Sequence, residues 1–185
     1  MAQLFASLLH YPVLDRHGRV VTSAITSLDI HDLARSAATY GVTAVYIVHP
    51  AVDQRNFART VIDHWIAGQG RVLDERRQQA LKLVEVVADL DEAIESVMTR
   101  TGDSPMLVMT SARAKGNISY SELRAQIAEK HGRPLMLLFG TAFGLAPAVA
   151  ERCELTLPAL KGPGEYNHLS VRAAAAAILD RLRGR

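Results

Sequence analysis

The chain has 185 residues, of which 49% are hydrophobic and 22% are charged, a composition typical of a globular protein. A formal net charge of +2 excludes a broadly basic protein, so contact with a nucleic acid would require a local basic patch. No apolar run approaches the roughly 18 residues of a membrane-spanning helix, and the amino-terminus has no signal-peptide pattern. The single cysteine, Cys153, excludes an internal disulfide and favours a reducing, cytoplasmic location.

Apolar runs alternate with helical patterns along the first half of the chain. Buried strands read as short, continuous apolar runs, whereas surface helices place apolar residues three or four positions apart. A glycine directly after a helix is typical of its carboxyl-terminal cap, as at Gly41. The predicted elements are a strand at 4–9, a short strand at 20–25, a helix that begins at 27–29 and ends before Gly41, a strand at 43–48 and a helix at 53–67.

The second half continues the same alternation. Its predicted elements are a helix at 75–81, a strand at 82–87, a helix from 89 towards 99, a strand at 106–109, a helix at 119–131, a strand at 135–139, a short helix at 146–151, a strand at 154–157 and a last helix at 167–182. Strands separated by helices of about ten residues imply βαβ units. The sequence therefore predicts a single α/β domain over residues 1–185, with a parallel sheet and helices on both of its faces.

Three loops of unusual composition follow predicted strands in the second half: TSARAKG (110–116), GTAFG (140–144) and PALKGPGEYNH (158–168). Parallel α/β sheets bind ligands beyond the carboxyl ends of their strands. Glycine at 140 and 144 removes the Cβ that would block close approach, so the loop at 140–144 is either a ligand-binding loop or an ordinary strand-to-helix turn. No GxGxxG follows the first strand and no GxxxxGK[ST] occurs, which argues against a standard dinucleotide site or a P-loop.

Two stretches, LMLLFGTAFGL (135–145) and LPALKGPGEYNHLSVRAAAAAIL (157–179), resemble the SPOUT class (the SpoU–TrmD superfamily) of RNA methyltransferases. A third, DIHDLARSAATYGV (29–42), resembles the first SpoU motif, with Arg35 at the arginine of that motif. Nearly the whole chain is similar to a bacterial subfamily that occurs alone or fused behind tRNA guanine-N1 methyltransferase domains. The resemblance implies a deep trefoil knot in the carboxyl-terminal half, S-adenosylmethionine in the pocket that the knotted loops form, and a homodimer packed through the final helix.

The resemblance also implies which residues bind the cofactor. Glycines at 140, 144, 162 and 164 would let two loops and a nucleoside occupy one space, and leucines at 138, 145, 160 and 169 would surround the adenine. The full set of expected contacts is Thr110, Ser111, Phe139, Gly140, Thr141, Gly144, Leu157, Pro158, Leu160, Gly162, Tyr166, Asn167, His168, Leu169 and Ser170.

Four residues are candidates for the chemistry. Arg35 lies four positions after His31, so both share one helix face, and its guanidinium either stabilises a developing anion or pairs with Asp32. His31 is a candidate general base with Asp29 as its orienting partner, although Asp29 is equally suited to cap the helix. His168 is expected to open the last helix and to face the ligand.

The expected RNA contacts are Asp15, Arg16, Arg35, Arg113 and Arg172, and the scattered histidines predict no metal site.

The predicted function is S-adenosylmethionine-dependent methylation of RNA, with tRNA as the substrate and a guanine nitrogen or a ribose 2′-oxygen as the acceptor. Many SpoU enzymes carry a glutamate in the loop where this chain has Ala142 and Phe143. That departure leaves a second hypothesis open, a non-catalytic knotted module that binds RNA or the cofactor. A third hypothesis is a Rossmann-like enzyme that uses NAD or another nucleotide.

Overall fold

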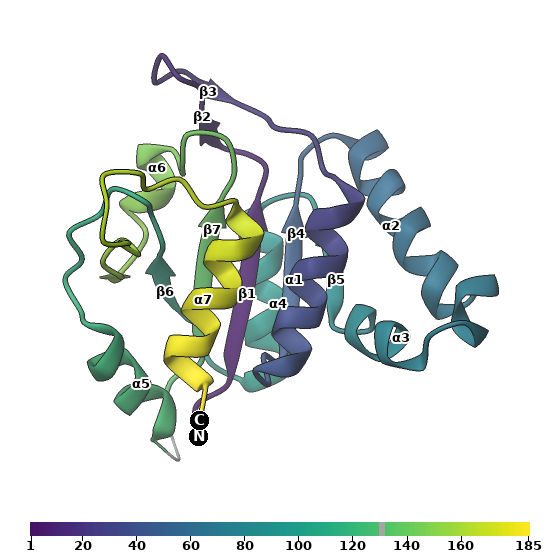
Figure 1. The fold of residues 1–185 in the computed structure, drawn as a ribbon. Helices are drawn as coiled ribbons and strands as arrows, with labels where there is room; N and C mark the ends of the chain where they lie inside the picture. The colour runs from purple at the N-terminus through teal and green to yellow at the C-terminus, as the bar shows by residue number, and fades with distance from the viewer. Residues whose placement is uncertain (130–131) are drawn as a thin grey trace.

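The computed structural model describes residues 1–129 and 132–185, and within them six strands form a parallel sheet (Figure 1). The central strand β1 pairs with β4 on one side and β7 on the other, giving the order β5-β4-β1-β7-β6-β8. Every residue of β1 and β4 is buried, which explains why their sequences are apolar apart from Ser7. The strands are β1 (Leu4–Leu9), β4 (Ala44–Val48), β5 (Val84–Val87), β6 (Met106–Met109), β7 (Leu135–Gly140) and β8 (Leu155–Thr156).

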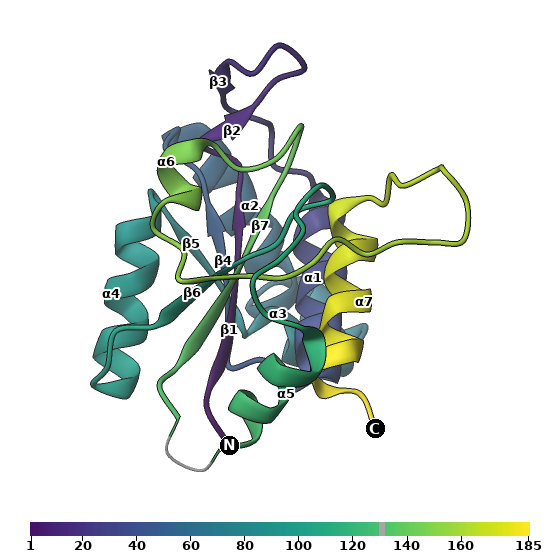
Figure 2. The same ribbon diagram turned by 90° about the vertical axis from the view of Figure 1, so that its left-hand side faces the viewer.

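Helices cover both faces of this sheet (Figure 2). Because side chains alternate along a strand, Leu4 and Leu8 of β1 pack into one apolar cluster, and Phe5 and Leu9 pack into another. The first cluster includes residues from α1 (Ser27–Thr39), α2 (Val52–Ile66), α3 (Glu75–Leu81), α5 (Tyr120–Ala128) and α7 (Val171–Arg183), and the second includes residues from α4 (Leu90–Thr101) and α6 (Pro147–Ala150). A 3₁₀ helix, η1 (Gln69–Val72), links α2 to α3. None of the helices in the described ranges is long and apolar enough to cross a membrane.

A small hairpin stands over the carboxyl ends of the strands, at the top of Figure 1. It consists of β2 (Val13–Leu14) and β3 (Val20–Val21), which pair antiparallel. Val13 also forms a bridge to Leu145, after the carboxyl end of β7. The hairpin is therefore attached to the loop that leaves the sheet at β7.

The order of strands and helices follows the sequence prediction, with corrections at particular boundaries. The predicted strand at 20–25 is limited to β3, and β2 was not predicted. The last helix begins at Val171 and not at 167, because the Ser170 side chain accepts a hydrogen bond from the Ala173 backbone and caps it. His168 therefore lies in the segment before the helix and does not open it. The helix predicted over 119–131 ends earlier, at Ala128, because Glu129 has an extended backbone; positions 130 and 131 lie outside the described residues.

Helix α1 starts with a reciprocal cap. The Thr26 hydroxyl accepts a hydrogen bond from the Asp29 backbone N–H, and the Asp29 carboxylate accepts one from the Thr26 backbone N–H. The helix ends at Thr39, before Gly41 as predicted, and Gly41 takes the left-handed conformation common after a helix (φ +66°). The cap places Asp29 at the carboxyl-terminal edge of the sheet.

Candidate functional site

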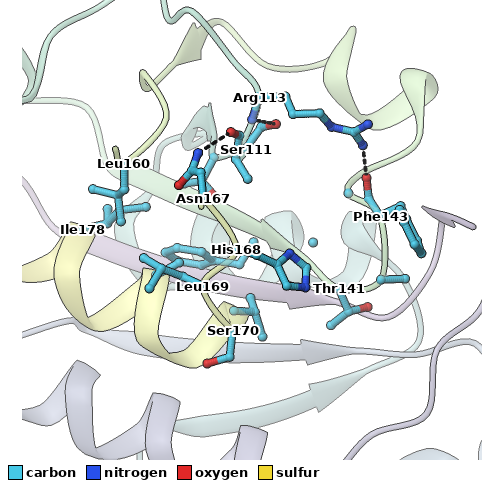
Figure 3. Close-up of a pocket in the computed structure, with 18 of the residues that line it drawn as sticks. Ser111, Arg113, Thr141, Phe143, Leu160, Asn167, His168, Leu169, Ser170 and Ile178 are labelled. Atoms are coloured by element: carbon cyan, nitrogen blue, oxygen red, sulfur yellow. Dashed lines mark hydrogen bonds between the residues drawn. The ribbon is translucent and has the colours of Figure 1, made fainter. Parts of the chain in front are cut away.

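A cavity of about 550 Å³ lies beyond the carboxyl ends of β6 and β7 (Figure 3). Its volume is within the range of small-molecule sites in proteins. Apolar side chains such as Leu157, Leu160 and Ile178 line one part of it, and hydroxyl and amide groups line another. The lining comes from segments at 23–29, 110–120, 139–144, 157–160 and 167–178.

The loop that follows β7 forms one wall of the cavity. A Cβ at Gly140 would lie 2.9 Å from the Leu145 side chain and backbone, so the chain can turn here only with glycine. The Leu14 backbone N–H donates to Gly144 O (2.9 Å), which ties the loop to the hairpin. The sequence left a ligand-binding loop and an ordinary turn open for this stretch, and the structure places it at the cavity.

The opposite wall is made where the β6 loop meets the segment after β8. A Cβ at Gly116 would lie 2.6 Å from the Pro158 nitrogen, so these two backbones approach as closely as glycine allows. The Ala159 N–H donates to Ala114 O (3.0 Å), and Asn167 Nδ2 donates to Ala112 O (3.2 Å). Two loops distant in sequence are thus joined by hydrogen bonds along the cavity.

A partly buried polar network forms part of the cavity wall. Ser23 and Thr141 both line the cavity, and their hydroxyls are hydrogen bonded to each other (2.5 Å). Ser23 Oγ also bonds to Nδ1 of His10, at 2.9 Å, and Ser23 O accepts from Nε2 of His49, at 3.1 Å. The His10 carbonyl accepts from the Ser23 N–H (2.9 Å). Two buried histidines therefore fix the position of one serine in the cavity wall.

Hydrogen-bond partners define the tautomers of these histidines. His49 Nδ1 accepts from the Ala51 N–H, so the ring proton is on Nε2. Thr141 donates to Leu9 O, so it accepts from Ser23, and Ser23 in turn accepts from the Nδ1–H of His10. Burial lowers the pKa of His10 to about 4 and also lowers the pKa of His49, so both rings are neutral near pH 7.

Asp29 lies in the cavity wall, but its carboxylate is hydrogen bonded to other residues of the chain. Its buried carboxylate accepts from the Thr26 hydroxyl (2.6 Å) and from Arg172 (3.0 Å). Arg172 also pairs with Asp32, at 3.2 Å. This bridge joins the start of α7 to the start of α1, and it gives Arg172 a structural role.

His31 and Arg35 do not reach the cavity. The His31 ring lies edge-on to Trp65, at a centroid distance of 5.7 Å, and burial followed by the nearby Arg77 charge lowers its pKa. Arg35 is exposed in a shallow groove between α1 and α7, which it shares with Tyr40 and Arg172. Asp29 therefore orients neither of them. Of the four candidates for chemistry, Asp29 and His168 line the cavity.

The predicted cofactor contacts are brought together, with two exceptions. Gly162 and Tyr166 lie outside the lining, and Tyr166 is 83% exposed. Leu138 is buried in the core and Leu145 lies behind Gly140, so neither forms the expected wall. The other expected contacts that line the cavity are Thr110, Ser111, Phe139, Gly140, Thr141, Gly144, Leu157, Pro158, Leu160, Asn167, His168, Leu169 and Ser170.

Close approach between two loops occurs at Gly116 and not at Gly144, Gly162 or Gly164, and Gly140 approaches only Leu145 of its own loop. Around Gly144, Gly162 and Gly164, no atom of the described residues lies within 4 Å of an added Cβ. Gly144 instead has a left-handed backbone (φ +111°) that favours glycine.

Sequence reasoning missed several residues of the lining. Val171, Ala174 and Ile178 share one face of α7 at helical spacing, a signal that the alanine-rich sequence hides. Nothing local in sequence pairs Ser23 with Thr141, because 118 positions separate them. The missed residues are Ser23, Ala24, Ala112, Tyr120, Ala142, Phe143, Val171, Ala174 and Ile178.

Because Arg35 and Arg172 lie in the groove between α1 and α7, the predicted RNA contacts do not all lie at the cavity. Arg113 lines it and donates to Phe143 O (2.5 Å). Asp15 and Arg16 lie at the hairpin turn, where Asp15 pairs with Arg19 (2.7 Å). Hydrogen bonds, first from the Arg19 backbone, hold the pKa of Asp15 below its ordinary value. Arg16 is exposed, and its Nε donates a hydrogen bond to the ring of the neighbouring His17. Its positive charge therefore lies on the surface of the turn.

These features define a parallel α/β protein with a ligand cavity at the carboxyl ends of its strands. A methylase-family protein of Neisseria gonorrhoeae shares this fold with a TM-score of 0.65 at 19% identity, over 100% of this chain and 83% of that one. The SpoU methyltransferase AviRb of Streptomyces viridochromogenes, solved with AdoMet, has a TM-score of 0.59 at 19% identity, over 98% of this chain and 56% of that one. At such identities the likeness establishes the fold alone.

The chain belongs to a family of S-adenosylmethionine-dependent RNA methyltransferases, which its residues 3–184 match. The tRNA (guanine-N(1)-)-methyltransferase of Oleidesulfovibrio alaskensis is 42% identical over 98% of this chain and 42% of the relative. An uncharacterised protein of Aquifex aeolicus is 39% identical over 98% of this chain and 89% of its own length. The chain thus spans less than half of the tRNA methyltransferase that it matches. Membership confirms the resemblance to the SPOUT class.

The cavity fits the cofactor of this family. Leu157, Leu160 and Ile178 offer apolar surface for an adenine, and the loops at 110–113 and 139–144 offer backbone amides and hydroxyls for polar groups. A Cβ at Gly140 would have no room against Leu145, so the wall there is backbone. Nucleoside sites commonly combine apolar walls with a few such polar groups.

Proposed function

We propose that this chain transfers a methyl group to tRNA, at a guanine nitrogen or a ribose 2′-oxygen. Family membership supports the reaction class over the hypothesis of a nicotinamide enzyme. The observation that carries the proposal is the cavity beyond β6 and β7. Most of the residues expected to bind the cofactor line this one cavity. The tRNA substrate rests on the names of relatives that are more than twice as long as the part matched here.

The loops at 110–113, 139–144 and 157–160 and the segment at 167–170 hold the cofactor. Bound S-adenosylmethionine supplies an electrophilic methyl group on its sulfonium sulfur. The chain itself must place the acceptor atom in line with that group, at about 3–3.5 Å, and accept the proton that the acceptor loses.

His168 is the proton acceptor in this proposal. Asp29 lies in the same cavity, but Arg172 and Thr26 occupy its carboxylate. The Tyr120 hydroxyl donates to Pro158 O, and burial raises its pKa, so it stays protonated. His168 lines the same cavity, where Figure 3 shows it near Thr141.

The carboxyl-terminal half is knotted in this proposal, and residues 1–185 act as one domain. The close approach of Gly116 to Pro158 and the bond from Ala159 N–H to Ala114 O support passage of one loop through the other. An experimental structure in which the backbone of residues 106–183 forms no knot would contradict this proposal.

The protein forms a homodimer through the face made by α1 and α7. Ala173 and Ala176 lie in the shallow groove on that face, and such small side chains allow close helix packing. Arg35 lies in the same groove and outside the ligand cavity of its own protomer. It would therefore contact RNA or a second copy of the chain. Light scattering of the purified protein measures the mass, and a monomer at micromolar concentration would overturn the proposed dimer.

A non-catalytic binding module is the alternative function. The placement of His31 and Arg35 outside the cavity favours it, since two of the four candidates for chemistry do not face the ligand. Calorimetry with S-adenosylhomocysteine followed by a tritiated-methyl assay on bulk tRNA separates the two functions. Binding with transfer supports the enzyme, and binding without transfer supports the module.

Mass mapping of tRNA from cells that lack this chain then identifies the acceptor nucleotide, and fractionation tests the expected cytoplasmic location.

A further inference from the structure

Phe143 exposes an aromatic ring at the edge of the cavity. Its side chain is 53% exposed, whereas Phe5 and Phe139 are buried in the core. It lines the cavity, and Figure 3 shows it at the opposite end from Leu160 and Asn167. The ring is therefore available to a ligand that enters from outside.

The backbone around Phe143 holds this ring in place. Its N–H donates to Leu14 O (3.0 Å), and its carbonyl accepts from the Arg113 guanidinium (2.5 Å). The preceding Ala142 has φ +52°, an uncommon conformation for a residue other than glycine. A fixed, locally strained loop that presents an exposed aromatic ring beside a ligand cavity indicates a function for the ring.

Positively charged residues belong to both segments that hold the Phe143 backbone. Arg113 is bonded to its carbonyl, and the hairpin strand that contains Leu14 leads directly to Arg16. The one carboxylate of that turn, Asp15, is paired with Arg19. Proteins that bind single-stranded nucleic acid combine exposed aromatic rings, which stack on the bases, with cationic side chains, which attract the phosphates.

We propose that Phe143 is a stacking platform for a nucleobase of the RNA substrate at the mouth of the cavity. The proposal rests on the proposed function, because it takes RNA as the substrate. It gives a role to the loop position at which the chain departs from the glutamate of many SpoU enzymes. The ring contributes to RNA binding, while the loop backbone contributes to the cavity wall.

The test compares Phe143→Ala, Phe143→Leu and Phe143→Tyr with the wild type and with Phe57→Leu. Phe57 is a matched control, since it is 42% exposed on α2 and lies outside the cavity lining. Affinity for bulk tRNA is measured by filter binding with saturating S-adenosylhomocysteine. Loss of one stacked base weakens binding by about 5- to 150-fold, which is the result expected for the Ala and Leu variants. Phe143→Tyr and Phe57→Leu are expected to stay within about twofold of the wild type, because a tyrosine ring still stacks.

A second readout locates the contact. Ultraviolet irradiation of the wild-type complex with tRNA, followed by mass spectrometry, is expected to give a nucleotide adduct on Phe143. Wild-type tRNA affinity in both the Ala and Leu variants, or an equal loss in Phe57→Leu, would overturn the inference while leaving the proposed function intact. Failure of the wild type itself to bind tRNA would overturn both. Loss of S-adenosylhomocysteine affinity in Phe143→Leu with wild-type affinity for tRNA would assign the ring to the cofactor and reject the stacking role.

Discussion

The His10 ring and the Ser23 hydroxyl form a hydrogen bond of 2.9 Å that links the end of β1 to the wall of the cavity. The His10 ring is buried, and its Nε2 has no hydrogen-bond partner among the described residues. A second proton on that ring would be buried without an acceptor, so the network requires neutral His10. The position of Ser23 is thus coupled to a protonation state.

This coupling predicts a dependence of stability on pH. The pKa of His10 is about 4 in the folded chain and about 6.5 when unfolded, so the unfolded state binds the proton first as pH falls. The contribution of neutral His10 to the free energy of unfolding is complete above pH 6.5 and is lost between pH 6.5 and 4. It amounts to at most about 3 kcal/mol. Urea unfolding at pH 7, 5.5 and 4.5 measures it.

The matched variant is His10→Asn, whose amide can still donate to Ser23 but does not titrate. Its free energy of unfolding should change less with pH than that of the wild type. The control variant, His17→Asn at the exposed hairpin turn, should show the same pH dependence of unfolding as the wild type. An equally steep dependence in the His10 variant would contradict the coupling.

The sequence predicted the layered α/β fold because each buried strand and amphipathic helix carries its own periodicity. It missed β2 because two residues are too few to show an alternation. It started the last helix at 167 because the alanine-rich stretch carries no strong start signal, and only the Ser170 cap identifies the boundary.

The site was predicted where a motif is local and missed where a contact is distant. Gly140 and Thr141 are adjacent in one loop, whereas Ser23 comes from the other end of the chain. The spacing of His31 and Arg35 showed that they share a helix face, but spacing cannot tell which neighbour that face meets. The structure turns His31 towards Trp65.

Replacement of His168 tests its role as proton acceptor. His168→Gln should lower the rate of methyl transfer to tRNA by about 10²- to 10⁴-fold, the usual contribution of a general base. S-adenosylhomocysteine affinity should change little, since backbone and apolar contacts from the other loops remain. His64→Gln, on α2, is the control for loss of a surface histidine. Wild-type transfer by the His168 variant would remove this residue from the mechanism.

Gly116 and Gly102 form a matched pair for the approach of the two loops. Both have a left-handed backbone, at φ +79° and +81°, so alanine costs about 1 kcal/mol at either position. A Cβ at 116 would also meet the Pro158 nitrogen at 2.6 Å, whereas no described atom lies within 4 Å at 102. Gly116→Ala should therefore destabilise the protein by a further 1–3 kcal/mol or so and weaken S-adenosylhomocysteine binding. Equal unfolding midpoints and equal affinities for the two variants would show that the contact is dispensable.

Asp29 and Asp32 both pair with Arg172, but they differ in exposure. The Asp29 side chain is 6% exposed and also accepts bonds at the helix cap, whereas Asp32 is 45% exposed. Asp29→Asn leaves Arg172 without its buried partner and weakens the cap, so it should cost about 1–3 kcal/mol. Asp32→Asn removes a screened surface pair and should cost less than about 1 kcal/mol. Denaturant unfolding of the two variants measures the difference, and a larger loss for Asp32→Asn would show that the exposed pair, and not the buried one, joins α1 to α7.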